Sequence, residues 1–153
     1  MGARRAGCAV RKGRDLMEKH SLSHTSWECV YHIVWIPKYR RKVLYGETRR
    51  EIGEILRMLV ERMDGVEIVE GSTCGDHIHI CLRVPPKYAL SSVVGKLKGR
   101  SSIILHERHP EWRRLTGRDR TLWARGYYAS TIGLDEAKVR EYVRRQEEGS
   151  RIE

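Results

Sequence analysis

Residues 76–84 alternate strictly between apolar and polar side chains. Because successive side chains of a β-strand point to opposite faces, this period of two predicts a strand with one apolar and one polar face. Such a strand belongs in a sheet whose apolar face is covered by helices or by a second sheet. The apolar face consists of Ile78, Ile80, Leu82 and Val84, and the polar face consists of His77, His79, Cys81 and Arg83.

The rest of the chain supplies further strands and helices in alternation. The β-branched and aromatic run at residues 29–36 predicts a buried strand that ends at Pro37. Thr48 and Glu51 have the spacing of a capping box, and apolar residues at helical spacing follow as far as Met63. The remaining expected elements are a short strand at 66–70, a turn at 71–75, helices at 90–108 and from Asp135 to about residue 148, and a strand at 122–132. This βαββαβα order predicts an α+β fold of ferredoxin-like type, an antiparallel sheet with helices packed on one face.

The chain of 153 residues has room for one domain, and 40% hydrophobic residues are enough for a core. Residues 1–16 are basic and lack any helical or strand period, so we expect a disordered basic tail followed by a domain over 17–153. Met17 is an alternative first residue. No apolar run is long enough to span a membrane, and the first residues lack the apolar core of a secretory signal. Four cysteines without C-x-x-C pairs favour a cytoplasmic protein with reduced thiols.

A net charge of +10, carried mostly by arginine, makes a polyanion the first candidate partner. The excess is concentrated in residues 38–50 and 83–125. Within these segments we expect DNA phosphate contacts from Lys38, Arg40, Arg41, Lys42, Lys96 and Arg100. Gly95 and Gly99 lie beside Lys96 and Arg100, and their lack of side chains would let a DNA backbone approach the helix closely. The alternative is that these glycines help the helix pack on the sheet.

His77 and His79 share the polar face of the predicted strand, and two imidazoles at this spacing can converge on one divalent cation. Two histidines on the polar side of an amphipathic strand are also a common structural arrangement. Tyr142 and Gln146 stand one turn apart on the last predicted helix, where a phenol is a candidate nucleophile and an amide oxygen a candidate metal ligand. Taken alone, that pair is more often structural. Zinc bound with Cys74 and Cys81 is an alternative, but this cysteine and histidine spacing fits no common structural zinc pattern.

Five stretches of the sequence, spread over residues 19–148, carry a resemblance to a known family. They read SLSHTSWECVYHIVWIPKYRRKVLY, GDHIHICLRVPPKY, VVGKLKGRSS, LWARGYYASTIG and EYVRRQEE. In this order the chain resembles the single-tyrosine HUH transposases of small prokaryotic insertion sequences, the IS-two-hundred-like TnpA group. The resemblance implies that His77, His79 and Gln146 bind Mg²⁺ or Mn²⁺, and that Tyr142 is the nucleophile. The tail at 1–16 matches nothing in the family.

The resemblance also implies a reaction and its partners. The metal would polarise the scissile phosphate of single-stranded DNA with hairpin ends, and Tyr142 would attack it. The products would be a 5′-phosphotyrosine and a free 3′-OH, and a second 3′-OH could then rejoin the strands without ATP. The family implies a homodimer, with no membrane partner. Two alternatives stay open, namely a domesticated relative that acts on chromosomal repeats and a non-catalytic nucleic-acid-binding module.

Overall fold

The computed structural model describes residues 20–22, 25–38, 44–112, 121–133 and 135–149. Four strands form one antiparallel sheet, in the order β4 (Glu67–Thr73), β5 (Ile78–Arg83), β3 (Val30–Trp35) and β6 (Tyr128–Ser130). The first and third strands of the βαββαβ unit therefore lie at the centre of the sheet, and the second and fourth lie at its edges. This order is the expected ferredoxin-like arrangement. A separate hairpin of β1 (His20–Leu22) and β2 (Thr25–Trp27) precedes the sheet.

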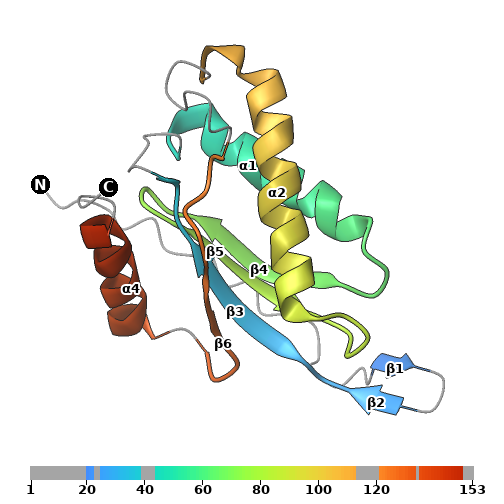
Figure 1. Ribbon diagram of the computed structural model, residues 1–153. Helices are drawn as coiled ribbons and strands as arrows, with labels where there is room; N and C mark the ends of the chain where they lie inside the picture. The colour runs from blue at the N-terminus through green and yellow to red at the C-terminus, as the bar shows by residue number, and fades with distance from the viewer. Residues whose placement is uncertain (1–19, 23–24, 39–43, 113–120, 134, 150–153) are drawn as a thin grey trace, which may run out of the picture.

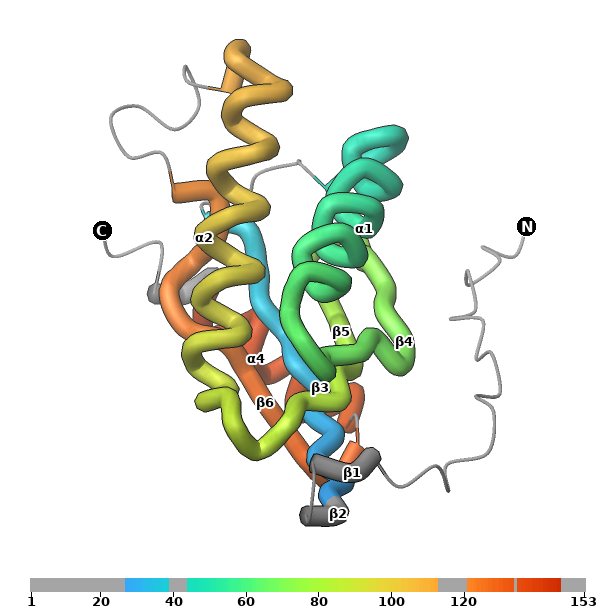
Figure 2. Tube along the Cα trace, turned by 90° about the vertical axis from the view of Figure 1, so that its right-hand side faces the viewer, coloured from blue at the N-terminus to red at the C-terminus, as the bar shows by residue number. Residues whose placement is uncertain are grey.

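Helices α1 (Gly46–Glu61) and α2 (Leu90–Arg108) cover one face of the sheet, as Figures 1 and 2 show. The main core lies between these helices and the apolar side of β5 and β3. Its largest buried members include Ile33, Trp35, Ile52, Ile78, Leu82 and Leu97. The alternation of residues 76–84 is confirmed, because Ile78, Ile80, Leu82 and Val84 all belong to this core.

The last helix, α4 (Glu136–Gly149), lies on the other face of the sheet (Figure 1). It packs Val139 and Val143 against Val34 and Ile36 of the β3 segment, which point away from the main core. The expectation of helices on one face therefore holds for α1 and α2, whereas α4 covers part of the second face. Asp135 caps this helix as expected, because its Oδ1 accepts hydrogen bonds from the backbone N–H of Ala137 at 3.0 Å and of Lys138 at 3.4 Å.

Two of the sequence-based boundaries are wrong. Helix α1 begins at Gly46 after Tyr45, without a side-chain cap, so Thr48 lies inside the helix. Glu51 instead accepts hydrogen bonds from Arg108 and His109, at 3.2 and 2.7 Å, and joins α1 to the end of α2. A tertiary contact has replaced the predicted capping box. Residues 71–73, expected in a turn, extend the edge strand β4 because they pair with β5.

The expected strand at 122–132 is largely irregular. Only Tyr128–Ser130 pair with β3, and Trp123 adds an isolated bridge to Pro37. Buried serines of α2 hold the first part of this segment, because Ser101 Oγ accepts from Trp123 Nε1 at 2.9 Å and Ser102 Oγ accepts from the Leu122 N–H at 3.1 Å. Gly126, at φ 77°, then turns the chain into β6. The predicted tail at 1–16 and residues 113–120 of the basic segment lie outside the described residues.

We expect Asp135→Ala to lower the free energy of unfolding by about 1 kcal/mol, because two backbone N–H groups of α4 lose their acceptor. Asp135→Asn should stay within a few tenths of a kcal/mol of the wild type, since an amide oxygen also caps a helix. Urea unfolding followed by circular dichroism measures both values. Equal stability of the alanine variant and the wild type would contradict the capping role.

Candidate functional site

His77 lies in the turn that joins β4 to β5, directly before the first residue of β5. Its carbonyl oxygen accepts the Cys74 N–H at 2.8 Å, which closes the turn. Its Nδ1 donates to Asp76 Oδ1 at 2.6 Å. Burial acts to lower the pKa of His77, but hydrogen bonds with Asp76 and Cys74 outweigh it and raise this pKa to about 9. The turn therefore holds a half-buried histidine that stays protonated at neutral pH when no metal competes for it.

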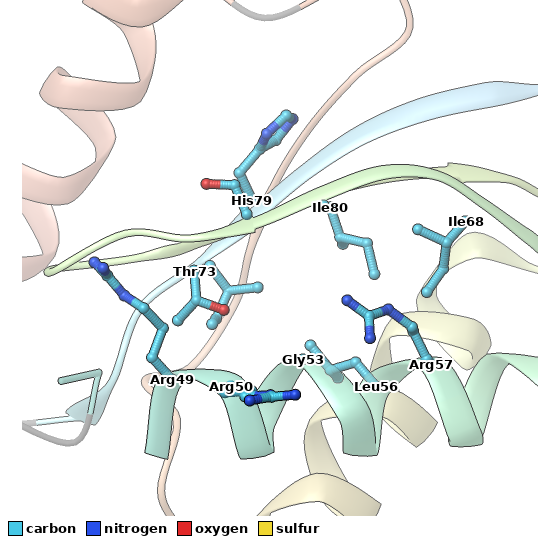
Figure 3. Close-up of a pocket in the computed structure, with 12 residues that line it drawn as sticks. Arg49, Arg50, Gly53, Leu56, Arg57, Ile68, Thr73, His79 and Ile80 are labelled. Atoms are coloured by element: carbon cyan, nitrogen blue, oxygen red, sulfur yellow. The ribbon is translucent and has the colours of Figure 1, made fainter. Parts of the chain in front are cut away.

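His79 lies at the centre of the sheet and is 4% exposed. Figure 3 shows its side chain on the side of the sheet away from α1. Burial lowers the pKa of His79, and the nearby His32 and His77 rings lower it further. The neutral imidazole, which is the form that binds metals, is therefore favoured at His79. The two histidines of the predicted pair lie close enough for their charges to interact, but their pKa values are shifted in opposite directions, upwards at His77 and downwards at His79.

Two side chains that the sequence did not single out lie beside His79. His32 comes from β3, and its Nδ1 is 3.2 Å from His79 Nε2. Glu70 comes from β4, and the ligand atoms of the three residues all lie within 4.8 Å of one another. In the described part of the chain this is the one group of three or more His, Cys, Asp or Glu side chains at that spacing, and neither His77 nor a cysteine belongs to it. A zinc site built from Cys74 and Cys81 finds no support here.

Tyr142 lies on the inner side of α4, on the same face of the sheet as His79. It packs against the small apolar cluster around Val34, and Val34 is the cross-strand partner of His79. The Tyr142 ring lies 6.1 Å from that of Tyr128. Its hydroxyl is buried without a hydrogen-bond partner among the described residues, and burial raises the pKa of the phenol. Gln146 lies one turn further along α4 and is half-buried.

The predicted DNA-contacting cations are distributed over two regions. Lys96 and Arg100 are exposed on α2, whereas Lys38 is half-buried at the end of the β3 segment, and its N–H donates to the Leu122 carbonyl at 2.8 Å. Arg40, Arg41 and Lys42 lie outside the described residues. A further basic feature is a pocket of about 210 Å³ between α1 and β4, which Arg49, Arg50 and Arg57 line (Figure 3).

Gly95 and Gly99 line a second, larger cleft of about 530 Å³ between α2 and residues 121–127. A Cβ atom at either glycine would meet nothing within 4 Å, so these glycines do not let α2 pack closely on the sheet. Lys98 lies in the same cleft and donates to the carbonyl oxygens of Ala124 and Gly126, at 2.7 and 2.6 Å. Burial lowers the pKa of Lys98 to about 8. Trp123, which also lines this cleft, belongs to the main core and is 2% exposed.

Known proteins share the sequence pattern and the sheet fold of this chain, in which a histidine pair lies at the start of β5 and a C-terminal helix carries a tyrosine. The sequence profile of the family described as "Transposase IS200 like" matches residues 25–146. The chain belongs to the IS200-like transposase family. The transposase is 46% identical over 135 residues to the transposase for insertion sequence element IS200 of Salmonella typhimurium, covering 88% of each chain. It is 30% identical over 122 residues to the ISDra2 transposase TnpA of Deinococcus radiodurans, covering 78% of this chain and 85% of that one.

Solved structures share the fold of the transposase. A putative transposase from Deinococcus radiodurans R1 superposes with a TM-score of 0.73 at 25% identity, over 83% of this chain and 97% of that one. A REP-associated tyrosine transposase bound to a REP hairpin superposes with a TM-score of 0.51 at 13% identity, over 81% of this chain and 68% of that one. Within the described residues, no helix combines the length and apolar character needed to cross a bilayer.

In the metal-free transposase we expect His77 to titrate with a midpoint near pH 9, as its pKa of about 9 implies. The folded pKa lies above the ordinary value of 6.5, so the stabilisation by the protonated ring is fully present below about pH 6.5 and is lost as the pH rises through 9. Asp76→Asn should bring the midpoint down towards 6.5, which NMR of the histidine ring protons measures. A midpoint that does not change in Asp76→Asn would show that this carboxylate is not the cause.

Proposed function

We propose that this transposase cleaves and rejoins single-stranded DNA at insertion-sequence ends through a 5′-phosphotyrosine at Tyr142. The observation that carries the proposal is that α4 packs Tyr142 onto the same face of the sheet from which His79 projects. A candidate nucleophile and a candidate metal ligand, distant in sequence, thus lie on the same face of the sheet. Membership of the IS200-like family supports transposition as the reaction that this surface serves.

In the proposed reaction the Tyr142 phenolate attacks the scissile phosphorus in line, and the P–O3′ bond breaks. The 5′-phosphate stays on Tyr142, and the departing 3′ oxygen takes up a proton. A 3′-OH of another strand then attacks the phosphotyrosine, reforms a phosphodiester and returns the phenol. Because each step exchanges one phosphoester for another, no nucleotide cofactor is needed. The enzyme class that we propose is therefore a strand transferase rather than a hydrolase.

His77, His79 and Gln146 are the side chains that we propose to hold Mg²⁺ or Mn²⁺. When bound, such an ion would polarise a non-bridging oxygen of the scissile phosphate. Two imidazoles with one amide oxygen suit Mn²⁺ better than Mg²⁺, which prefers oxygen ligands throughout. His77 Nδ1 donates to Asp76, and this hydrogen bond orients the ring so that Nε2 is the remaining ligand atom once the metal has displaced its proton.

Tyr142 must leave its present packing before it can react. Its hydroxyl is inaccessible, and the raised pKa makes the phenolate harder to form. We therefore propose that α4 shifts when DNA binds, and that two copies act as a homodimer, as the family resemblance implies. α4 rests on the sheet through a small apolar cluster separate from the main core, so a shift of this helix leaves that core intact.

We expect Tyr142→Phe to abolish the covalent protein–DNA adduct while leaving DNA affinity within about two-fold of the wild type, because only the attacking oxygen is lost. Tyr128→Phe is the matched control, since it removes a hydroxyl from the neighbouring ring and should keep the adduct. The protein is incubated with single-stranded DNA from its element ends and Mn²⁺, and the adduct is read on a denaturing gel. An adduct that survives in Tyr142→Phe would refute the assignment of the nucleophile.

Lys96 and Arg100 are proposed to contact DNA phosphates, as neighbouring exposed cations one turn apart on α2. The double variant Lys96→Gln/Arg100→Gln should bind single-stranded DNA more weakly. Its plot of log affinity against log salt should be shallower by roughly 1.4, because each phosphate contact releases about 0.7 counterions from a single strand. Arg62→Gln/Lys87→Gln removes the same charge elsewhere and should keep the wild-type slope. Equal slopes for both double variants would count against a DNA contact at Lys96 and Arg100.

A further inference from the structure

The chain between Trp123 and Tyr128 is longer than the strand segment beside it. Trp123 is bridged to Pro37 and Tyr128 pairs with Val34, so five steps along this chain correspond to three steps along the β3 segment. The two surplus residues form a bulge, which we call the 124–126 bulge. A bulge interrupts the ladder of backbone hydrogen bonds and leaves carbonyl groups that need donors from elsewhere.

Lys98 of α2 supplies those donors. Its Nζ donates to the carbonyl oxygens of Ala124 and Gly126, at 2.7 and 2.6 Å. The side chain is half-buried, and burial lowers the pKa of the amine to about 8, so it is mostly protonated at neutral pH and has three N–H groups to donate. Within the described residues the amine contacts two carbonyl groups and no carboxylate. Lys98 thus joins α2 directly to the backbone of the bulge.

The residues at the two ends of this bulge carry α4. Ala124 belongs to the small apolar cluster that lies under α4, and Tyr128 packs against the same cluster. The ring of Tyr128 lies 6.1 Å from that of Tyr142. Residues 121–130 run between α2 and α4, as Figure 1 shows in orange. One end of the Lys98 contact is therefore on α2, and the other is on the segment that supports the nucleophile helix.

The attachment of α4 depends on this cluster. The helix has three hydrophobic side chains larger than alanine, namely Val139, Tyr142 and Val143, and all three pack there. A displacement of the 124–126 bulge would move Ala124 and Tyr128 away from them. The main core would keep its contacts, because its buried residues form a separate cluster.

We propose that Lys98 is a positioning residue for the nucleophile, which fixes the 124–126 bulge and so holds Tyr142 in its packed position. The inference rests on the proposed strand transfer, because that reaction requires Tyr142 to leave this packing. Lys98 then sets how readily the phenol becomes available, and it acts through Ala124 and Tyr128 rather than by touching the phenol. The ordinary alternative is that Lys98 stabilises the fold as a whole, with no particular effect on α4.

Hydrogen exchange of the full-length, DNA-free protein separates the two. Lys98→Met keeps the apolar stem but loses the donors, so amide exchange in α4 should be faster by about ten-fold or more, with exchange in α1 and β5 unchanged. Lys98→Gln, a milder change, should show the same selectivity. Lys98→Arg should restore slow exchange, since a guanidinium can donate to both carbonyl groups. Arg125→Met is the matched control, because it removes an exposed cation from the bulge itself but takes away no donor to these carbonyl groups.

The ionisation of Tyr142 gives a second, spectroscopic readout. Burial raises the pKa of this phenol in the wild type, and in Lys98→Met the pKa should fall towards the ordinary value of 10.0 as α4 loosens. NMR of protein with ¹³C-labelled tyrosine rings measures it, and the Tyr142 signal is the one that disappears in Tyr142→Phe. Arg125→Met should keep the wild-type value.

Three results would overturn the proposal. One is faster exchange in α1, β5 and α4 alike, or a failure of both Lys98→Met and Lys98→Gln to fold, which would indicate stabilisation of the whole domain. Another is unchanged α4 exchange with an unchanged Tyr142 pKa in folded Lys98→Met. A third is an equal effect of Arg125→Met. All readouts are taken without DNA, so they remain valid if another residue proves to be the one that DNA is linked to.

Discussion

The strict alternation of β5 is the constraint on which the rest of the molecule depends. β5 is an interior strand, and residues 78–82 are all buried. Burial of the side chains of Ile78, Ile80 and Leu82 contributes about 1.5–3 kcal/mol each to the stability of the fold. A shift of the strand register by one residue would turn His79 and Cys81 into the core in their place. The same register that builds the main core therefore sets the face from which His79 projects. Stability and the placement of the candidate site follow from one pattern.

The regular elements near this strand were predictable because their signals are local. Helix α2 spans residues 90–108 as expected, and the strand at 29–36 and the capped helix after Asp135 are found within one or two residues of their predicted positions. The errors lie where tertiary contacts override local preference. Glu51 pairs with the end of α2 instead of capping α1, and residues 71–73 extend β4 because β5 offers a partner for their backbone. A short stretch of sequence reveals neither of these tertiary partners, the end of α2 or strand β5.

The candidate site likewise contains some residues that local sequence patterns identify and others that only the structure reveals. The spacing of His77 and His79 singled out both residues, and the family resemblance pointed to Tyr142 and Gln146. His32 and Glu70 could not be found in this manner, because they lie on other strands and become neighbours of His79 only through the sheet register and the bulge at Val69. Nor does the sequence reveal the opposite pKa shifts of His77 and His79, which follow from a carboxylate beside one ring and burial of the other.

The most direct test of the proposed chemistry is to locate the DNA-linked residue by peptide mass spectrometry. The wild-type transposase is allowed to react with single-stranded DNA from its element ends, and the adduct is trimmed with nuclease and digested with trypsin. We predict a nucleotide mass on the peptide that contains Tyr142, with the phosphate on its phenol oxygen. A nucleotide on Tyr127 or Tyr128, or a cleaved strand with no protein-linked nucleotide, would contradict strand transfer through Tyr142.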